Sequence, residues 1–175
     1  MDEIEAKILE VDQNQVRSTL AMLGAKKVFD DEMETLFFDF ETNSIANAKN
    51  VLRLRREGHQ VVLTFKNVLS NQAAKIAHEY SVEVSSLDDA RKILECLGLH
   101  VVESMQKHRV SYQLGEVHFD LDCYKGDYSF IPEFLEIEAP NIELIHKYAQ
   151  TLGFSPKDCL PWSTLDLINH YSKGK

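Results

Sequence analysis

The residues of this sequence best suited to chemistry are charged side chains that come in pairs, two positions apart. Carboxylates bind hard cations such as Mg²⁺ and Mn²⁺ through oxygen, whereas arginine and lysine bind phosphate oxygens. A site that combines the two kinds of pair would bind a metal ion together with a polyphosphate. The pairs are Glu3 and Glu5, Arg53 and Arg55, Lys107 and Arg109, Asp120 and Asp122, and Glu136 and Glu138.

A spacing of two places both members of a pair on the same face of a β-strand. Leu52 and Leu54 alternate with Arg53 and Arg55, so that segment has one apolar and one charged face. We therefore predict strands of this two-faced kind along most of the chain. Their charged faces together contain Glu3, Glu5, Lys7, Arg53, Arg55, Lys66, Glu79, Glu83, Lys107, Arg109, Asp122, Glu136 and Glu138.

Three segments with apolar residues at helical spacing predict amphipathic helices of about three turns. Each begins after a residue that caps helices well, namely Asp12, Ser86 and Asn141, and each ends at a Leu-Gly pair. The apolar stripes of these helices need the apolar face of a sheet to cover. We therefore expect one α+β domain over residues 1–175, with about eight mostly antiparallel strands and the helices packed outside the sheet.

The residues alone leave two interpretations of the charged face open. It is either the solvated outer face of an antiparallel sheet or the inner lining of a closed or nearly closed one. Helices that cover the outside favour the inner lining, where mixed charges are costly without ligands to compensate them. The six cations suit a triphosphate, and the carboxylates suit Mg²⁺ or Mn²⁺ rather than zinc. These cations are Lys7, Arg53, Arg55, Lys66, Lys107 and Arg109.

The composition excludes several classes of protein. The 175 residues carry 19 Lys and Arg against 28 Asp and Glu, a net charge of −9, which argues against a protein that coats nucleic acid or anionic lipid. No stretch approaches the roughly 20 apolar residues that span a bilayer. Cys96, Cys123 and Cys159 form neither a disulfide framework nor a zinc motif. We expect a cytoplasmic monomer or homodimer.

The segment Glu3-Ile4-Glu5-Ala6-Lys7 resembles the ExExK signature that opens the CYTH family, the triphosphate tunnel metalloenzymes. This family includes class IV adenylyl cyclases, thiamine triphosphatases and inorganic triphosphatases. The later motifs follow in the order of the family across nearly the whole chain. They are Phe38-Asp39, Leu52-Arg53-Leu54-Arg55, Leu63-Thr64-Phe65-Lys66, His78-Glu79-Tyr80, Lys107-His108-Arg109, Leu121-Asp122 and Glu136-Ile137-Glu138.

The resemblance implies an eight-stranded antiparallel β-tunnel with charged residues projecting inward. It also implies roles for individual residues. The metal ligands would be Glu3, Glu5, Asp122, Glu136 and Glu138, and the substrate-binding residues would be Lys7, Arg53, Arg55, Lys66, Lys107 and Arg109. We expect Lys7, Arg55 and Lys66 from this set, together with Glu79, to be catalytic.

Three functions fit this pattern. A triphosphatase would hydrolyse the terminal phosphate of tripolyphosphate or of an organic or nucleoside triphosphate. A class IV adenylyl cyclase would convert ATP to cyclic AMP and pyrophosphate, and a non-catalytic module would bind polyphosphate. The four paired glutamates argue for a metal and for catalysis. The chain also lacks the extra residues that often precede ExExK in the cyclases, so we expect a triphosphatase.

Turnover should require an added divalent metal, because clustered carboxylates repel one another and need a cation to neutralise them. Glu5→Gln or Glu138→Gln should lower the activity by about two orders of magnitude, since each would remove a metal ligand. The measurement is the release of phosphate and pyrophosphate with Mg²⁺ or Mn²⁺. Full activity in excess EDTA would contradict this prediction.

Overall fold

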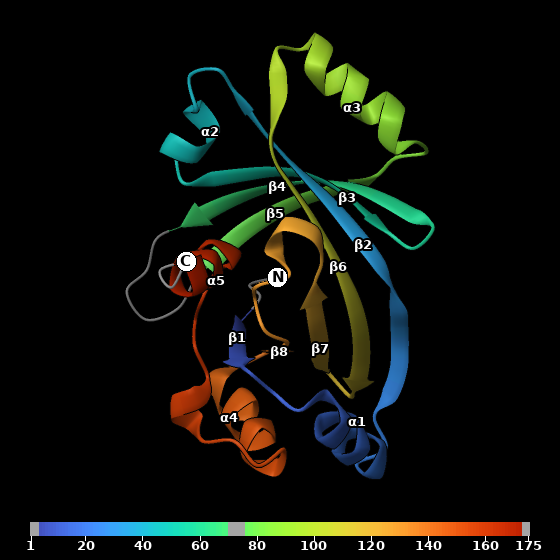
Figure 1. Cartoon of the computed structure of the whole chain (residues 1–175), viewed down its shortest axis with the longest axis vertical. Coiled ribbons are helices and arrows are strands. Elements are labelled where there is room, and N and C mark those ends of the chain that lie inside the picture. The colour runs from blue at the N-terminus through green and yellow to red at the C-terminus, as the bar shows by residue number, and fades with distance from the viewer. Residues whose placement is uncertain (1–3, 70–75, 173–175) are drawn as a thin grey trace. The chain divides into compact units, whose positions relative to one another are not determined.

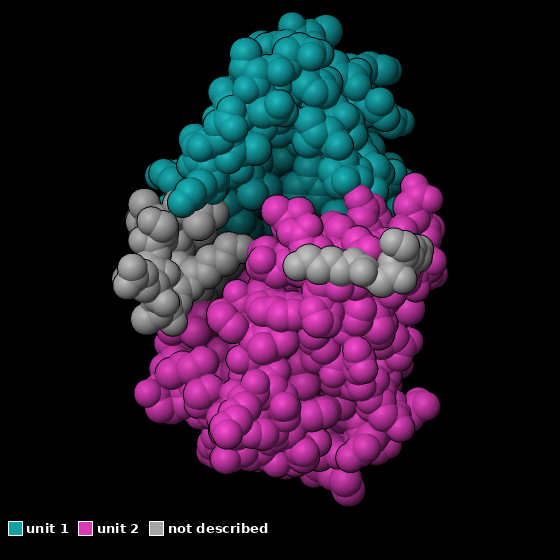
Figure 2. Space-filling view, turned by 60° about the vertical axis from the view of Figure 1, so that its left-hand side comes forward, with its two compact units in different colours: residues 1, 31–106 teal, residues 2–30, 107–175 magenta. Residues whose placement is uncertain are grey.

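The computed structural model describes residues 4–69 and 76–172. Within this part the chain forms two compact units (Figure 2). Unit 1 contains residues 31–106, and unit 2 contains residues 2–30 and 107–175. Glu3, which the sequence predicts to be a metal ligand, lies outside the described residues.

The strands form one eight-stranded sheet in the order β1-β8-β7-β6-β2-β3-β4-β5 (Figure 1). The strand pairs are antiparallel. The long strands β2 and β6 are neighbours, and each contributes to both units. The strands are β1 Ile4–Leu9, β2 Lys26–Phe40, β3 Asn50–Glu57, β4 Gln60–Leu69, β5 Ile76–Glu83, β6 Leu99–Leu114, β7 Val117–Tyr124 and β8 Phe134–Ala139.

The three helices that the sequence predicts are present with the predicted caps. The side chains of Asp12, Ser86 and Asn141 each accept hydrogen bonds from backbone N–H groups of the first helical turn. Two further α-helices and two short 3₁₀ turns complete the fold. The helices are α1 Gln13–Met22, α2 Ser44–Asn47, α3 Leu87–Cys96, α4 Ile142–Thr151 and α5 Thr164–Ser172, and the turns are η1 Gly126–Tyr128 and η2 Pro156–Asp158.

The core of unit 2 lies between one face of its strands and the helices α1 and α4. Alternate residues of β7, including Phe119 and Leu121, are fully buried there. Val16 and Leu20 of α1 and Ile145 of α4 cover them. The opposite face of the same strands therefore holds the intervening charged residues.

The core of unit 1 is built in the same way from β2, β3 and α3. Leu36, Leu54 and Leu94 belong to this core, and Leu54 is fully buried. The sequence also predicts Ile93 and Leu97 in the apolar stripe of α3. The structure corrects this, because their side chains are 60% and 66% exposed. The narrower stripe of α3 faces the sheet, and these two residues lie outside it.

These observations confirm an α+β fold with eight antiparallel strands and helices on its apolar face. The prediction that residues 1–175 form a single domain stays a prediction. The three cysteines are free thiols. Within the described ranges, no helix has the length and apolar character needed to cross a membrane.

The Phe38-Asp39 motif has a structural role in unit 1, which depends on the side chain of Asp39. Its side chain is 3% exposed and accepts backbone N–H bonds from Phe40, Ile45 and Ala46 at 2.7–2.9 Å. Two of these donors belong to the first turn of α2, whose N-cap residue Asn43 makes no side-chain cap bond. Asp39 therefore caps a four-residue helix from outside it.

Asp39→Ala should lower the free energy of unfolding by about 2–4 kcal/mol, because it removes the acceptor of three backbone donors. Burial raises the pKa of Asp39, but the backbone N–H groups outweigh it and hold the pKa below its ordinary value. The carboxylate thus contributes its stability at neutral pH and loses it as the pH falls below about 4.

Urea unfolding of the wild type and Asp39→Asn between pH 7 and pH 2.5 tests this sign. The difference in free energy should be full at pH 7 and should shrink in acid. Glu116→Gln, at an exposed turn, is the matched control and should change little at any pH. A difference that grows in acid would contradict the prediction.

Candidate functional site

The charged face of unit 2 is built from rows of residues that lie directly opposite one another on β1, β8, β7 and β6. One row pairs Lys7 with Glu136, and Glu136 with Asp120. A second row pairs Glu5 with Glu138. Arg109 lies opposite Asp122 between β6 and β7. Residues directly opposite in an antiparallel pair share a face, so the whole group lies on one side of the sheet.

Lys7 is buried at the centre of this face. Its ammonium forms ion pairs with Glu136 and, at 3.4 Å, with Glu5. Its backbone is fixed as well, because Lys7 and Leu160 exchange two 2.8 Å hydrogen bonds between their N–H and C=O groups. The C-terminal segment thus covers the outer edge of β1 at the level of the ammonium group.

Arg109 connects three carboxylates. Its Nε and Nη2 donate to the two oxygens of Asp122, both at 2.6 Å, and its Nη1 donates to Asp120. A fourth bond runs from Nη2 to Glu136 at 3.3 Å. A guanidinium has five N–H donors, so within the described chain one of them remains for a ligand.

Lys107 reaches the same carboxylate from the neighbouring position on β6. Its Nζ donates to Oδ2 of Asp122 at 2.7 Å and lies 5.8 Å from the ring centre of Tyr124. The Tyr124 ring stacks on Phe134, and its hydroxyl hydrogen-bonds Thr164 at the start of α5. The ammonium group of Lys107 is therefore held between a buried anion and a packed aromatic ring.

The ion pairs fix the charge states of this face. Burial alone would lower the pKa of Lys7, but Glu136 and Glu5 raise it above its ordinary value. Burial would raise the pKa of Glu136, yet Lys7 and Arg109 hold it well below the usual range. Asp122 is shifted in the same direction by Arg109 and Lys107. Each of these pKa shifts favours the charged form of its group at neutral pH.

Asp120 behaves differently from its neighbours. Burial raises its pKa, and the negative charges of Glu136 and Asp122 add to that effect. The ion pair with Arg109 opposes the shift without cancelling it. Burial and two neighbouring carboxylates together therefore favour the protonated form of Asp120 relative to an isolated aspartate.

The charged face of unit 1 is smaller and is built on β3, β4 and β5. Lys66 lies opposite Glu79 and forms an ion pair with it, and Arg53 lies 4.0 Å from the same carboxylate. Arg55 donates to Glu57 at 2.9 Å. The hydroxyls of Thr64 and Ser81, one row further along, share a 3.0 Å hydrogen bond. The side chains of Arg53, Arg55, Lys66 and Glu79 are each about one-fifth exposed.

The two faces differ in charge balance. On β3, β4 and β5 of unit 1, three cations stand on the same face as three carboxylates, Glu57, Glu79 and Glu83. In unit 2, three cations share the face with five carboxylates. These residues are Lys7, Lys107 and Arg109 against Glu5, Asp120, Asp122, Glu136 and Glu138.

The donors of unit 2 fit a hard divalent cation. Glu5 and Glu138 face each other across β1 and β8, a like-charge arrangement that destabilises a sheet unless a cation lies nearby. Among the residues that the structure describes, no three His, Cys, Asp or Glu side chains converge on one metal position.

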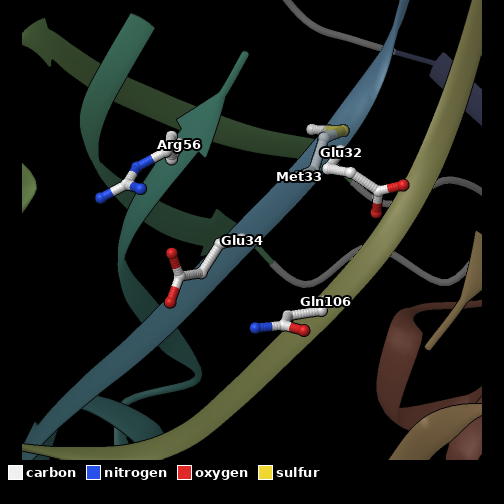
Figure 3. A pocket seen from close by; sticks show the side chains of 5 residues that line it. All are labelled: Glu32, Met33, Glu34, Arg56 and Gln106. Carbon is white, nitrogen blue, oxygen red and sulfur yellow. The ribbon is translucent and has the colours of Figure 1, made fainter. Parts of the chain in front are cut away.

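A separate pocket of about 220 Å³ lies in unit 1 (Figure 3). Arg56 from β3 and Gln106 from β6 line it together with Glu32, Met33 and Glu34 from β2. Its volume is below the roughly 300 Å³ at which ligand pockets begin. It is not a candidate for a triphosphate.

The structure therefore groups the predicted residues by unit. Lys7, Lys107, Arg109, Glu5, Asp122, Glu136 and Glu138 share the face of unit 2, and Arg53, Arg55, Lys66 and Glu79 share that of unit 1. The prediction left out Asp120 and Glu57, which pair with Arg109 and Arg55. Asp120 and Glu57 lie two positions from the predicted residues Asp122 and Arg55, and this spacing could have identified them as members of the same face.

Comparison with known proteins agrees with this arrangement. The CYTH domain model matches residues 1–160. A Methanocaldococcus jannaschii protein named "Putative adenylate cyclase" is 26% identical over 138 residues, which cover 79% of this chain and 77% of that protein.

Two solved structures share the fold. One, described as a putative adenylate cyclase from Vibrio parahaemolyticus, has a TM-score of 0.81 at 19% identity and covers 97% of this chain and 98% of its own. The other, from Hippeastrum, has a TM-score of 0.65 at 16% identity, with coverage of 100% and 97%. Its description reads "Putative adenylyl cyclase HpAC1 from Hippeastrum reveals a dominant triphophatase activity". The motif order, the eight-stranded fold and the family match agree, and the chain belongs to the CYTH family.

Proposed function

We propose that this chain is a divalent-metal-dependent triphosphatase, which hydrolyses the terminal phosphate of tripolyphosphate or of an organic or nucleoside triphosphate. The charge balance of the unit 2 face supports this most directly. A site for a bare polyanion would carry an excess of cations, whereas this face carries two excess negative charges. Such a face suits a polyphosphate that binds together with a divalent cation.

The proposal gives each group of residues a role. Glu5 and Glu138, with Glu136 beside them, would hold Mg²⁺ or Mn²⁺, and Glu3 continues the same pattern outside the described residues. The phosphate oxygens would be bound by Lys7, Arg53, Arg55, Lys66, Lys107 and Arg109. Lys7, Arg55, Lys66 and Glu79 are the residues we expect to act on the reacting phosphate.

In this reaction a water oxygen bonds to the terminal phosphorus while the bond to the bridging oxygen breaks. A bound divalent cation supplies charge neutralisation and makes water more acidic. Lys7 remains protonated, because its two carboxylate partners raise its pKa, so it stabilises charge on phosphate oxygens rather than removing a proton. The arginines do the same for the departing diphosphate.

Adenylyl cyclisation is the second candidate, and the name of the Methanocaldococcus relative favours it. It would use the same charged residues, but the ribose 3′-hydroxyl would attack the α-phosphorus. That reaction requires a site that orients the nucleoside, and the sequence contains no motif that reads a purine. Terminal hydrolysis requires recognition of the phosphates alone. The activity named for the Hippeastrum protein is also in line with hydrolysis.

A turnover panel separates these functions. Tripolyphosphate, ATP and thiamine triphosphate are each incubated with Mg²⁺ or Mn²⁺, and phosphate, pyrophosphate and cyclic AMP are measured separately. Release of phosphate supports the triphosphatase. Pyrophosphate with cyclic AMP identifies a cyclase, and tight binding without products identifies a binding module.

Arg53→Ala should reduce the rise in melting temperature that tripolyphosphate and Mg²⁺ cause. A ligand that binds the folded state stabilises it by RT ln(1 + [L]/Kd), about 2.7 kcal/mol at a hundredfold excess. Loss of one phosphate-binding arginine should weaken binding by about 2–4 kcal/mol and remove most of this gain. Without ligand, Arg53→Ala should melt close to the wild type, because Glu79, the carboxylate beside Arg53, keeps its ion pair with Lys66.

Arg56→Ala is the matched control. Arg56 lies three positions after Arg53 on β3. It is exposed and points to the opposite face of the strand. It should show the full ligand-induced shift of the wild type. An equal shift in the wild type and both variants would remove Arg53 from the site.

A further inference from the structure

Three apolar side chains lie among the cations of the unit 1 face. Each stands directly opposite a cation on a neighbouring strand, and directly opposite residues share one face of the sheet. All three are half-buried, so part of each side chain reaches the surface of that face. Unit 1 therefore offers apolar surface next to its positive charges. The pairs are Phe37 with Arg53, Val51 with Lys66, and Val62 with Arg55.

The cations of the unit 2 face have different neighbours. Two of them lie opposite carboxylates, and the third lies opposite a buried tyrosine whose ring is stacked on a phenylalanine. Ligand sites for organic groups combine apolar surface with a few polar groups. Of the two faces, that of unit 1 is thus the better suited to a part of the substrate other than its phosphates. The unit 2 pairs are Lys7 with Glu136, Arg109 with Asp122, and Lys107 with Tyr124.

Phe37 is the aromatic member of the unit 1 group. Its neighbours Leu36 and Phe38 belong to the core, so the ring of Phe37 points to the charged face. Within the described chain this ring stacks on no other ring and has no cation over it. The ring is therefore placed to stack on a flat group of a ligand whose phosphates bind the neighbouring cations.

Thr35 provides a second, independent observation on the same face. It lies two positions before Phe37 on β2, stands opposite Arg55, and is 6% exposed. Its hydroxyl makes no hydrogen bond to any residue that the structure describes. The hydroxyl of Thr64, buried on the same face, is bonded to Ser81 at 3.0 Å. Because buried polar groups are normally hydrogen-bonded, the open hydroxyl of Thr35 points to a polar atom of a ligand.

We propose that Phe37 and Thr35 make this site selective for triphosphates that carry a flat heteroaromatic ring, over inorganic tripolyphosphate. The ring stacks on Phe37, and a polar atom of the organic group accepts a hydrogen bond from Thr35. Stacking tolerates different rings, so a nucleoside triphosphate and thiamine triphosphate share the chemistry that is recognised. This inference deepens the proposed function and rests on it for the role of the neighbouring cations Arg53 and Arg55.

Binding measured without turnover tests the preference. Imido analogues of ATP and of tripolyphosphate, which resist hydrolysis, are titrated into the protein with Mg²⁺. Tripolyphosphate carries more negative charge than ATP, so binding by charge alone would favour the inorganic analogue. We expect the ATP analogue to bind at least about fivefold more tightly, because it adds a stacked ring. Equal or tighter binding of the inorganic analogue overturns the proposal.

Phe37→Leu removes the ring and retains an apolar side chain. It should weaken binding of the ATP analogue by about tenfold and leave binding of the tripolyphosphate analogue within about twofold of the wild type. Equal losses for the two analogues, or none for either, overturn the proposal. Phe37→Met is a second variant without a ring, for use if the leucine variant does not fold.

Phe40→Leu is the matched control. Phe40 belongs to the same strand, is 37% exposed, and lies on the opposite face of β2. The control should bind both analogues as the wild type does. NMR adds a direct readout, because the ring protons of Phe37 should show NOEs to the adenine protons of the ATP analogue. Absence of these NOEs from the wild-type complex overturns the proposal.

Turnover distinguishes the two kinds of ring. Phe37→Leu should raise KM by about tenfold for ATP, for thiamine triphosphate or for both, and should leave KM for tripolyphosphate within about twofold. The substrates that are affected identify the ring, and an effect on neither overturns the proposal. Thr35→Val should raise KM for the same substrates by about threefold or more, and Thr35→Ser should restore it. An equal rise for tripolyphosphate would assign the hydroxyl to a phosphate and overturn the role of Thr35.

The outcomes separate this inference from the proposed function. If the wild type releases no phosphate from any triphosphate, the proposed function fails, while the binding and NOE measurements still decide the role of Phe37. If phosphate is released but the two analogues bind equally, the proposed function stands and the selectivity for a ring fails.

Discussion

The burial of opposite charges on one face of the sheet is the constraint on which the rest of unit 2 depends. A charge such as that of Lys7 is stable there because a carboxylate lies directly opposite on the next strand. A slip of one residue would move every charge into the apolar core and every core residue onto the charged face. The same alternation therefore fixes the register of the strands, the apolar surface on which α1 and α4 pack, and the residues that make up the charged face.

Not every pair of directly opposite residues on this face carries opposite charges. Arg109 bonds to Asp122, and Lys7 pairs with both Glu136 and Glu5, yet Glu5 and Glu138 lie directly opposite each other with like charge. A face built for stability alone would place a cation in one of these positions. In the proposed function, the five carboxylates of this face would favour binding of a divalent cation, at some cost in stability when no cation is bound.

The strand faces and helix caps were predictable from the sequence because they depend on local spacing. Asp12, Ser86 and Asn141 cap the helices that follow them directly. The partners across strands were not predictable, since alternation shows which face a residue occupies but not which residue lies opposite. The resemblance to the family implies that Asp122 is a metal ligand, and that role stays a prediction; its three hydrogen bonds to Arg109 and Lys107 are seen only in the structure. The role of Asp39 was hidden for a similar reason, because it caps a helix five residues away.

Charged residues that bind phosphate oxygens do not distinguish between the groups attached to the phosphates. In the proposed function, Lys7, Lys107 and Arg109 would interact with oxygens that are common to tripolyphosphate, ATP and thiamine triphosphate, so their contribution to binding would be nearly equal for all three. Discrimination requires contacts that one substrate makes and the others lack, such as stacking or hydrogen bonds to a base. Selection among triphosphates must therefore come from residues outside the charged rows.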